Sequence, residues 1–138
     1  MENPMVVRAS AEAVPYQTTL SDGQHQWLTD VSVASGGSDN APSPHQLFLS
    51  SLAGCTAITL AMYAKRKQWP LTHIQVDVEV LDEKLNSLPA QLKMKRIIHL
   101  QGGLDDSQRQ RLHEIANACP IHKLMTGQVQ IETQLTVI

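Results

Sequence analysis

The feature that most constrains this chain is a stretch without formal charge that runs from Gln46 to Ala64. Ser43 suits the N-cap of a helix, and Pro44 suits its first position. Basic residues follow the stretch, and Pro70 can stop a helix. The sequence therefore predicts one long apolar helix.

An uncharged stretch of this length could also span a membrane. Its hydropathy is lowered by small and hydroxylated residues, namely Ser50, Ser51, Gly54, Thr56 and Thr59, and no other segment looks membranous. We therefore expect no membrane partner, and a helix that is buried all round. One sheet can cover only one face of such a helix, so a second layer, for instance from another subunit, is required.

The residues before this helix favour strands. We expect short strands over Met5 to Ser10, Val14 to Leu20 and Gln24 to Asp30, with a hairpin tip at Asp22-Gly23. Residues 31 to 42 are rich in Gly, Asp, Asn and Pro, which predicts a loop.

The residues after the helix predict a mixture of strands and helices. Alternation predicts strands over Ile74 to Leu81 and Gln91 to Gln101. An amphipathic helix is expected over Asp105 to Ala118, and a shorter one starts at Pro120 and ends by Gly127. Gln128 to Ile138 alternates again and predicts a closing strand. With no linker or repeat, residues 1–138 are expected to form a single domain.

Composition argues against several classes of partner. The net charge is −2, and the 11 Lys and Arg residues form no long run, which disfavours nucleic acid and anionic membranes. The N-terminal residues lack the pattern of a signal peptide, so we expect a cytoplasmic protein. Thiols are kept reduced there, and the 2 cysteines are therefore either packing residues or reactive groups.

The two cysteines differ in their local settings. Cys55 is expected in the middle of the long helix, where it could pack as a small apolar residue. The dipole of that helix cannot activate it there, so any stabiliser of its thiolate must come from another segment or subunit. Cys119 precedes Pro120 and is expected near the N-cap of a helix, where free N–H groups stabilise a thiolate. Its position also continues the apolar face of Leu112 and Ile115.

A metal site is a weaker alternative. Cys119 and His122 have a spacing typical of metal ligands, and Cys55 could join them in a zinc site. A zinc site usually needs four ligands, and no second pair of closely spaced cysteines or histidines is present. We therefore expect no metal and no cofactor.

Two segments together resemble a known family. The segment from Ser43 to Leu60 (SPHQLFLSSLAGCTAITL) is similar to the cysteine-bearing central helix of the OsmC/Ohr family, and Cys119 to Leu124 (CPIHKL) resembles its second cysteine motif. Residues 23–30, 36–37 and 41–44 fit the OsmC-like branch. The resemblance implies an α+β fold with antiparallel sheets wrapped around long central helices in an intertwined homodimer.

The resemblance also implies an activity. Active members reduce organic hydroperoxides with a peroxidatic and a resolving cysteine, and an external dithiol then reduces the disulfide. Carried over to this chain, Cys55 is peroxidatic and Cys119 is resolving, so the expected partners are a small hydroperoxide and a dithiol reductant.

The chain departs from the peroxidase members at the groups that activate the thiolate. Those members use an Arg from the N-terminal region and a Glu near the start of the helix. Here the helix start reads His45-Gln46, and no arginine lies between Arg8 and Arg66. His25 and Gln46 are the candidate supporting residues. The alternative function is a non-catalytic stress or ligand-binding protein on the same scaffold.

Overall fold

The structure is a computed structural model that describes residues 5–11 and 14–137. The chain divides into two compact units, residues 1–49 and 50–138. The long predicted helix, α1 (Pro44–Lys67), begins in the first unit and continues in the second. Antiparallel sheets together with helices make this an α+β protein, as predicted.

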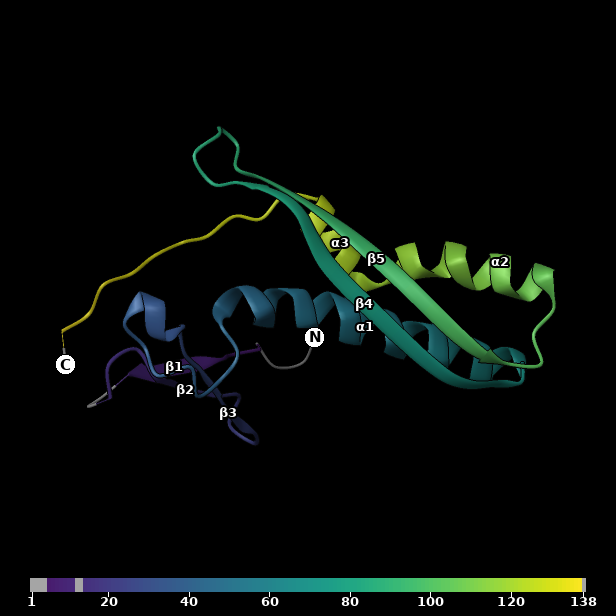
Figure 1. Cartoon of the computed structure of the whole chain (residues 1–138), viewed down its shortest axis with the longest axis horizontal. Coiled ribbons are helices and arrows are strands. Elements are labelled where there is room, and N and C mark those ends of the chain that lie inside the picture. The colour runs from purple at the N-terminus through teal and green to yellow at the C-terminus, as the bar shows by residue number, and fades with distance from the viewer. Residues whose placement is uncertain (1–4, 12–13, 138) are drawn as a thin grey trace. The chain divides into compact units, whose positions relative to one another are not determined.

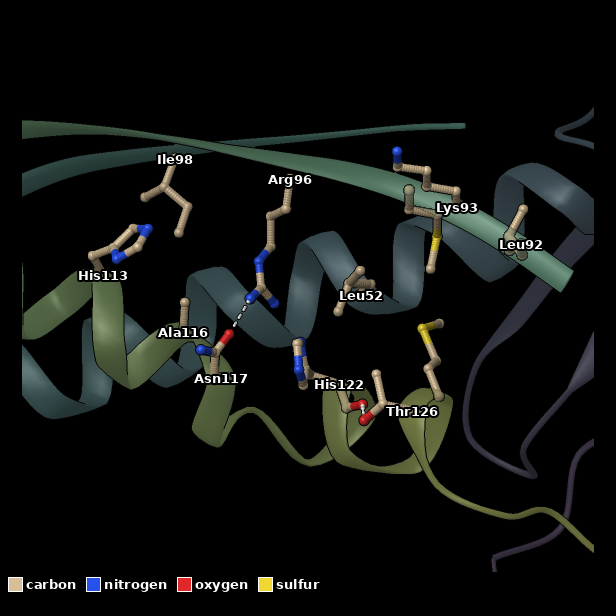
Figure 2. A pocket seen from close by; sticks show the side chains of 12 residues that line it. Leu52, Leu92, Lys93, Arg96, Ile98, His113, Ala116, Asn117, His122 and Thr126 are labelled. Carbon is tan, nitrogen blue, oxygen red and sulfur yellow. Dashed lines mark hydrogen bonds between the residues drawn. The ribbon is translucent and has the colours of Figure 1, made fainter. Parts of the chain in front are cut away.

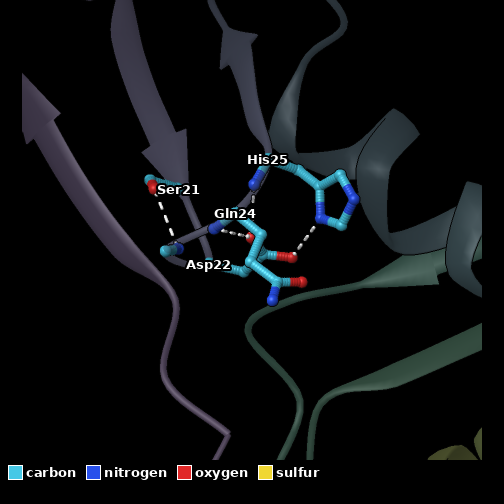
Figure 3. Close-up of polar contacts among 5 residues, drawn as sticks. Ser21, Asp22, Gln24 and His25 are labelled. Carbon is cyan, nitrogen blue, oxygen red and sulfur yellow. Dashed lines mark hydrogen bonds and ion pairs between the residues drawn. The ribbon is translucent and has the colours of Figure 1, made fainter.

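The first unit is built on a three-stranded antiparallel sheet. Its strands are β1 (Arg8–Ala11), β2 (Thr18–Ser21) and β3 (Gln26–Thr29), in the order β1-β2-β3. The hairpin tip predicted at Asp22-Gly23 joins β2 to β3, and Gly23 takes a φ of 95°, which favours glycine. The Asp22 carboxylate accepts hydrogen bonds from the backbone N–H groups of Gln24 and His25, at 2.8 and 2.6 Å (Figure 3).

The loop after β3 is held by a buried carboxylate. Asp30 accepts hydrogen bonds from the N–H groups of Val31 (2.7 Å) and Asn40 (3.1 Å). These bonds, that from Asn40 first, lower the pKa of Asp30. Gly37 lies so close that a Cβ there would be 2.4 Å from the Val31 carbonyl oxygen, so only glycine fits without a shift of the backbone. The loop also contains one short 3₁₀ turn, η1 (Val33–Ser35).

The start of α1 is closed by reciprocal hydrogen bonds between Ser43 and Gln46. The Gln46 N–H donates to Ser43 Oγ (3.2 Å), and the Ser43 N–H donates to Gln46 Oε1 (2.8 Å). This is a capping box, which satisfies two N–H groups at the helix start. The predicted N-cap at Ser43 is confirmed.

The second unit contains a long hairpin, the main part of α1 and the later helices. The hairpin pairs β4 (Leu71–Lys84) with β5 (Gln91–Gly102), and α2 (Asp106–Ile115), η2 (Ala116–Ala118) and α3 (Pro120–Thr126) follow it (Figure 1). The core joins these elements through buried side chains of α1, α2, η2 and the β5–α2 connection: Leu60, Tyr63, Leu104, Leu112 and Ala116. Apolar residues of β4 and β5, such as Ile74 and Ile98, pack against this core.

The burial of α1 is one-sided in the single chain. A stripe that includes Leu52, Thr56 and Leu60 is buried, whereas Ile58 and Met62 are 58% and 66% exposed. The elements of the second unit therefore cover one face of the helix, and the expected cover of its other face by a second layer stays a prediction. By length and composition alone α1 could cross a membrane, which is weak evidence because core helices of soluble proteins pass the same test.

The predicted closing strand over Gln128 to Ile138 is wrong for its described part. Residues 128–137 have no regular secondary structure, and Ile138 lies outside the described residues. The alternating apolar residues Val129, Ile131, Leu135 and Val137 are all exposed. A strand needs a neighbour to pair its backbone N–H and C=O groups, and none of the described strands pairs with this segment.

Candidate functional site: a thiol pair beside a half-buried arginine

The two cysteines, 64 positions apart in sequence (119 − 55), meet in the second unit. Cys55 lies in α1, and Cys119 is the N-cap residue of α3 with Pro120 in the first turn, as predicted. Their side chains lie close enough that each thiol shifts the pKa of the other. Cys119 is fully buried, Cys55 is half-buried, and both are free thiols.

The start of α3 directs backbone N–H groups at the sulfur atoms. The N–H of Ile121 lowers the pKa of both Cys55 and Cys119, and the N–H of His122 lowers that of Cys119. These groups are available because the first N–H groups of a helix have no partner within it. The hydroxyl of Thr59, one turn after Cys55 in α1, lies 4.0 Å from Cys55 Sγ.

These contacts shift the pKa values of the two thiols in opposite directions. Burial raises the pKa of Cys55, but hydrogen bonds from Cys119, the Ile121 N–H and Thr59 outweigh it and lower that pKa below the ordinary thiol value. Burial, followed by the hydrogen bond to Cys55, raises the pKa of Cys119. Helix position alone favoured Cys119 as the more acidic thiol, whereas the folded environment favours ionisation of Cys55.

A cation that the sequence analysis did not single out reaches this site. Arg96 of β5 donates a hydrogen bond from Nη1 to Thr56 Oγ1 (3.1 Å) and another from Nη2 to Asn117 Oδ1 (3.0 Å). Thr56 adjoins Cys55, and Asn117 is two residues before Cys119. The available signal was the position of Arg96 between Met94 and Ile98, on the strand face that otherwise carries apolar residues.

A cavity of about 520 Å³ is lined by residues of the second unit that include sequence neighbours of both cysteines, although neither cysteine lines it (Figure 2). Leu52 and His122 line it, and each is three residues from one of the cysteines. Leu92, Met94 and other apolar residues form much of the wall, while Arg96 provides a positive charge. Burial, and then the charge of Arg96, lower the pKa of His122, so its imidazole is neutral at pH 7.

The two predicted supporting residues have partners within the first unit. His25 Nδ1 lies 2.8 Å from the Asp22 carboxylate, as Figure 3 shows, and the side chain is well exposed. Gln46 belongs to the capping box of α1. Both residues therefore have hydrogen-bond partners in their own unit. That His25 and Gln46 support the thiols stays a prediction.

The metal alternative has no geometric support in the described residues. Across 5–11 and 14–137, no three His, Cys, Asp or Glu side chains gather in a cluster that could hold a metal ion. Cys55 and Cys119 are adjacent, but His122 does not complete a site with them.

Comparisons with known proteins agree on one family. The model of the family described as OsmC-like protein matches residues 36–134. An OsmC-like protein from Mycoplasma pneumoniae is 16% identical, with 92% of this chain and 90% of that chain covered and a TM-score of 0.75. No curated protein matches the chain.

Two other solved structures share the fold. The organic hydroperoxide resistance protein OsmC from Legionella pneumophila is 20% identical, with 92% of both chains covered and a TM-score of 0.68. An organic hydroperoxide resistance protein from Elizabethkingia anophelis is 18% identical over 92% of both chains, also at a TM-score of 0.68. The family match covers most of this chain, and the chain belongs to the OsmC-like protein family.

Proposed function

We propose that this protein is a thiol-dependent peroxidase that reduces organic hydroperoxides, with Cys55 as the peroxidatic and Cys119 as the resolving cysteine. The observation that carries the proposal is the proximity of two free thiols, 64 positions apart in sequence, whose pKa values shift in opposite directions. A thiol of lowered pKa supplies the nucleophilic thiolate, and a protonated neighbour is placed to form a disulfide.

The reaction consumes one hydroperoxide and one external dithiol. The Cys55 thiolate attacks the terminal oxygen of R–O–O–H, an S–O bond forms, the O–O bond breaks, and the alkoxide leaves and takes up a proton to give an alcohol. Cys55 is then a sulfenic acid. Cys119, after losing its proton, attacks that sulfur, so that a disulfide forms and hydroxide leaves as water. A dithiol restores both thiols by exchange.

The apolar cavity supports an organic substrate. A substrate with an alkyl or aryl group would bury apolar surface against Leu52, Leu92 and Met94, whereas hydrogen peroxide would gain no such contact. The names of the relatives from Legionella and Elizabethkingia, both organic hydroperoxide resistance proteins, point the same way.

Steady-state turnover tests the proposal. Wild type, Cys55→Ser and Cys119→Ser would be compared for consumption of cumene hydroperoxide with dithiothreitol, and for hydrogen peroxide in parallel. We expect wild type to consume cumene hydroperoxide faster than hydrogen peroxide, and Cys55→Ser to consume neither. Cys119→Ser should stop at a sulfenic acid on Cys55, which a dimedone-type reagent captures. Equal consumption by wild type and Cys55→Ser would refute the proposal.

The second candidate is a non-catalytic protein that binds an apolar ligand in the same cavity. Its support is the cavity itself, together with the missing Arg and Glu of the peroxidase members. It requires Cys55 to have the pKa of an unperturbed cysteine thiol, about 8.5. A midpoint well below that value in the alkylation of Cys55 would exclude it.

We further propose that the protein is a cytoplasmic homodimer. The exposed face of α1 carries Ile58 and Ala61, which line an open apolar hollow of about 650 Å³ with Trp69 and Ile74. A second copy could cover this face, as the family resemblance implies, and thereby complete the burial of the helix. Light scattering should give the mass of two chains for wild type, and Ile58→Asp should lower this mass toward that of a single chain. A monomeric wild type would contradict this assignment.

A further inference from the structure

We propose that Arg96 is the positioning residue of the thiol pair, because its guanidinium ties the segment that carries Cys55 to the segment that carries Cys119. The inference rests on the proposed function for the identity of the reactive thiol. It adds a residue outside the expected supporting pair, His25 and Gln46.

The first support is geometric. Each of the two Nη atoms of Arg96 holds a different segment: Nη1 donates to Thr56 of α1, and Nη2 donates to Asn117 of η2. Thr56 is fully buried and also donates to the Leu52 carbonyl at 2.7 Å, so the α1 anchor is fixed. A planar guanidinium can span two partners in this way, whereas a lysine ammonium is a single point.

The second support is electrostatic. Arg96 is half-buried among apolar residues, where its charge is screened less than it would be at the surface. Burial lowers the pKa of Arg96, and attraction to Cys119 opposes that shift. Since each thiol shifts the pKa of the other, a cation near either sulfur favours the first ionisation of the pair.

Three other ionisable side chains line the cavity together with Arg96. His122 of α3 has a lowered pKa and is neutral at pH 7. The other two are His113 of α2 and Lys93 of β5, and both side chains are exposed. Arg96 is the cation that is half-buried and hydrogen-bonded to both cysteine-bearing segments within the part of the chain described.

The pH dependence of Cys55 alkylation tests the inference independently of peroxide turnover. The rate of iodoacetamide modification at Cys55, resolved by peptide mass spectrometry, would be measured for wild type, Arg96→Met and Arg96→Lys. Lys95→Met is the matched control, because Lys95 is the preceding residue of β5, lies on the opposite strand face and is exposed. All proteins would first be checked for folding by circular dichroism.

We expect Arg96→Met to raise the midpoint and to slow alkylation at pH 7 about three- to tenfold, since one pKa unit is a tenfold change in thiolate. Arg96→Lys should recover only part of the rate, because it keeps the charge but cannot hold Thr56 and Asn117 in the same way. Lys95→Met should match wild type. Equal midpoints for Arg96→Met and Lys95→Met would overturn the inference, as would an Arg96→Lys rate equal to that of wild type.

Asn117→Asp keeps the inference falsifiable if Arg96→Met does not fold. Asn117 is exposed, and an aspartate there can still accept the hydrogen bond from Arg96 while it offsets the positive charge. The expected result is again a raised midpoint, and an unchanged midpoint overturns the inference. If peroxide turnover is absent but these shifts are present, the proposed function fails while the role of Arg96 stands.

Discussion

The guanidinium of Arg96 donates a hydrogen bond of 3.1 Å to the hydroxyl of Thr56, a residue 40 positions earlier in the chain. This contact links β5 to α1 at the residue next to Cys55. It also satisfies a threonine that is fully buried in a helix, where an unpaired polar group would be costly. One hydrogen bond therefore serves both the stability of the second unit and the arrangement of the thiols.

Thr56→Val should lower the free energy of unfolding by about 1–3 kcal/mol, because Arg96 Nη1 would lose its partner in a half-buried place. Urea unfolding followed by circular dichroism measures this change. Thr56→Ser keeps the hydroxyl and removes one methyl group, so it should cost only about 1 kcal/mol. A valine variant as stable as wild type would show that the contact contributes nothing.

Cys119→Ala should raise the midpoint for alkylation of Cys55. The hydrogen bond from Cys119 helps to lower the pKa of Cys55, and alanine cannot donate it, so the thiolate should form at higher pH. Alkylation rate against pH measures the shift. A midpoint that falls in Cys119→Ala would contradict the pairing of the thiols.

Leu112→Ala should destabilise the second unit by about 2–5 kcal/mol, because Leu112 is fully buried in the core next to α1. Leu124→Ala provides the control on α3. Leu124 is 60% exposed, and its truncation should change the free energy of unfolding by no more than about 0.5 kcal/mol. Similar losses for both variants would mean that the core is wrongly placed.

His25→Ala should raise the pKa of Asp22, which stands at about 2. The hydrogen bond from His25 is the largest cause of that low value, and the N–H groups of Gln24 and His25 add to it. Because the folded pKa is depressed, Asp22 contributes stability above its ordinary pKa and loses it as the pH falls toward about 2. Carbon-13 NMR of the carboxyl group measures the shift, and an unmoved value would refute the pairing.

Local signals in the sequence predicted much of this fold. Ser43 and Pro44 marked the start of α1, and Pro120 marked the start of α3, because caps and prolines act over a few residues. The closing strand failed because alternation at Val129 and Ile131 reports a tendency to pair but not the presence of a partner.

The sequence indicated the two cysteines of the candidate site but not Arg96. The family motifs indicated Cys55 and Cys119, but the contact of Arg96 with Thr56 depends on the packing of β5 against α1. An arginine in the apolar row between Met94 and Ile98 was the one local sign of it. No single-sequence pattern states which helix such an arginine faces.

The most direct test of the account is the product of a single oxidation. Reduced protein would be mixed with one equivalent of cumene hydroperoxide, and its thiols would be counted and its peptides mapped by mass spectrometry. The account predicts loss of both thiols, one equivalent of alcohol, and a disulfide that joins Cys55 to Cys119. Retention of both free thiols with the hydroperoxide intact would contradict it.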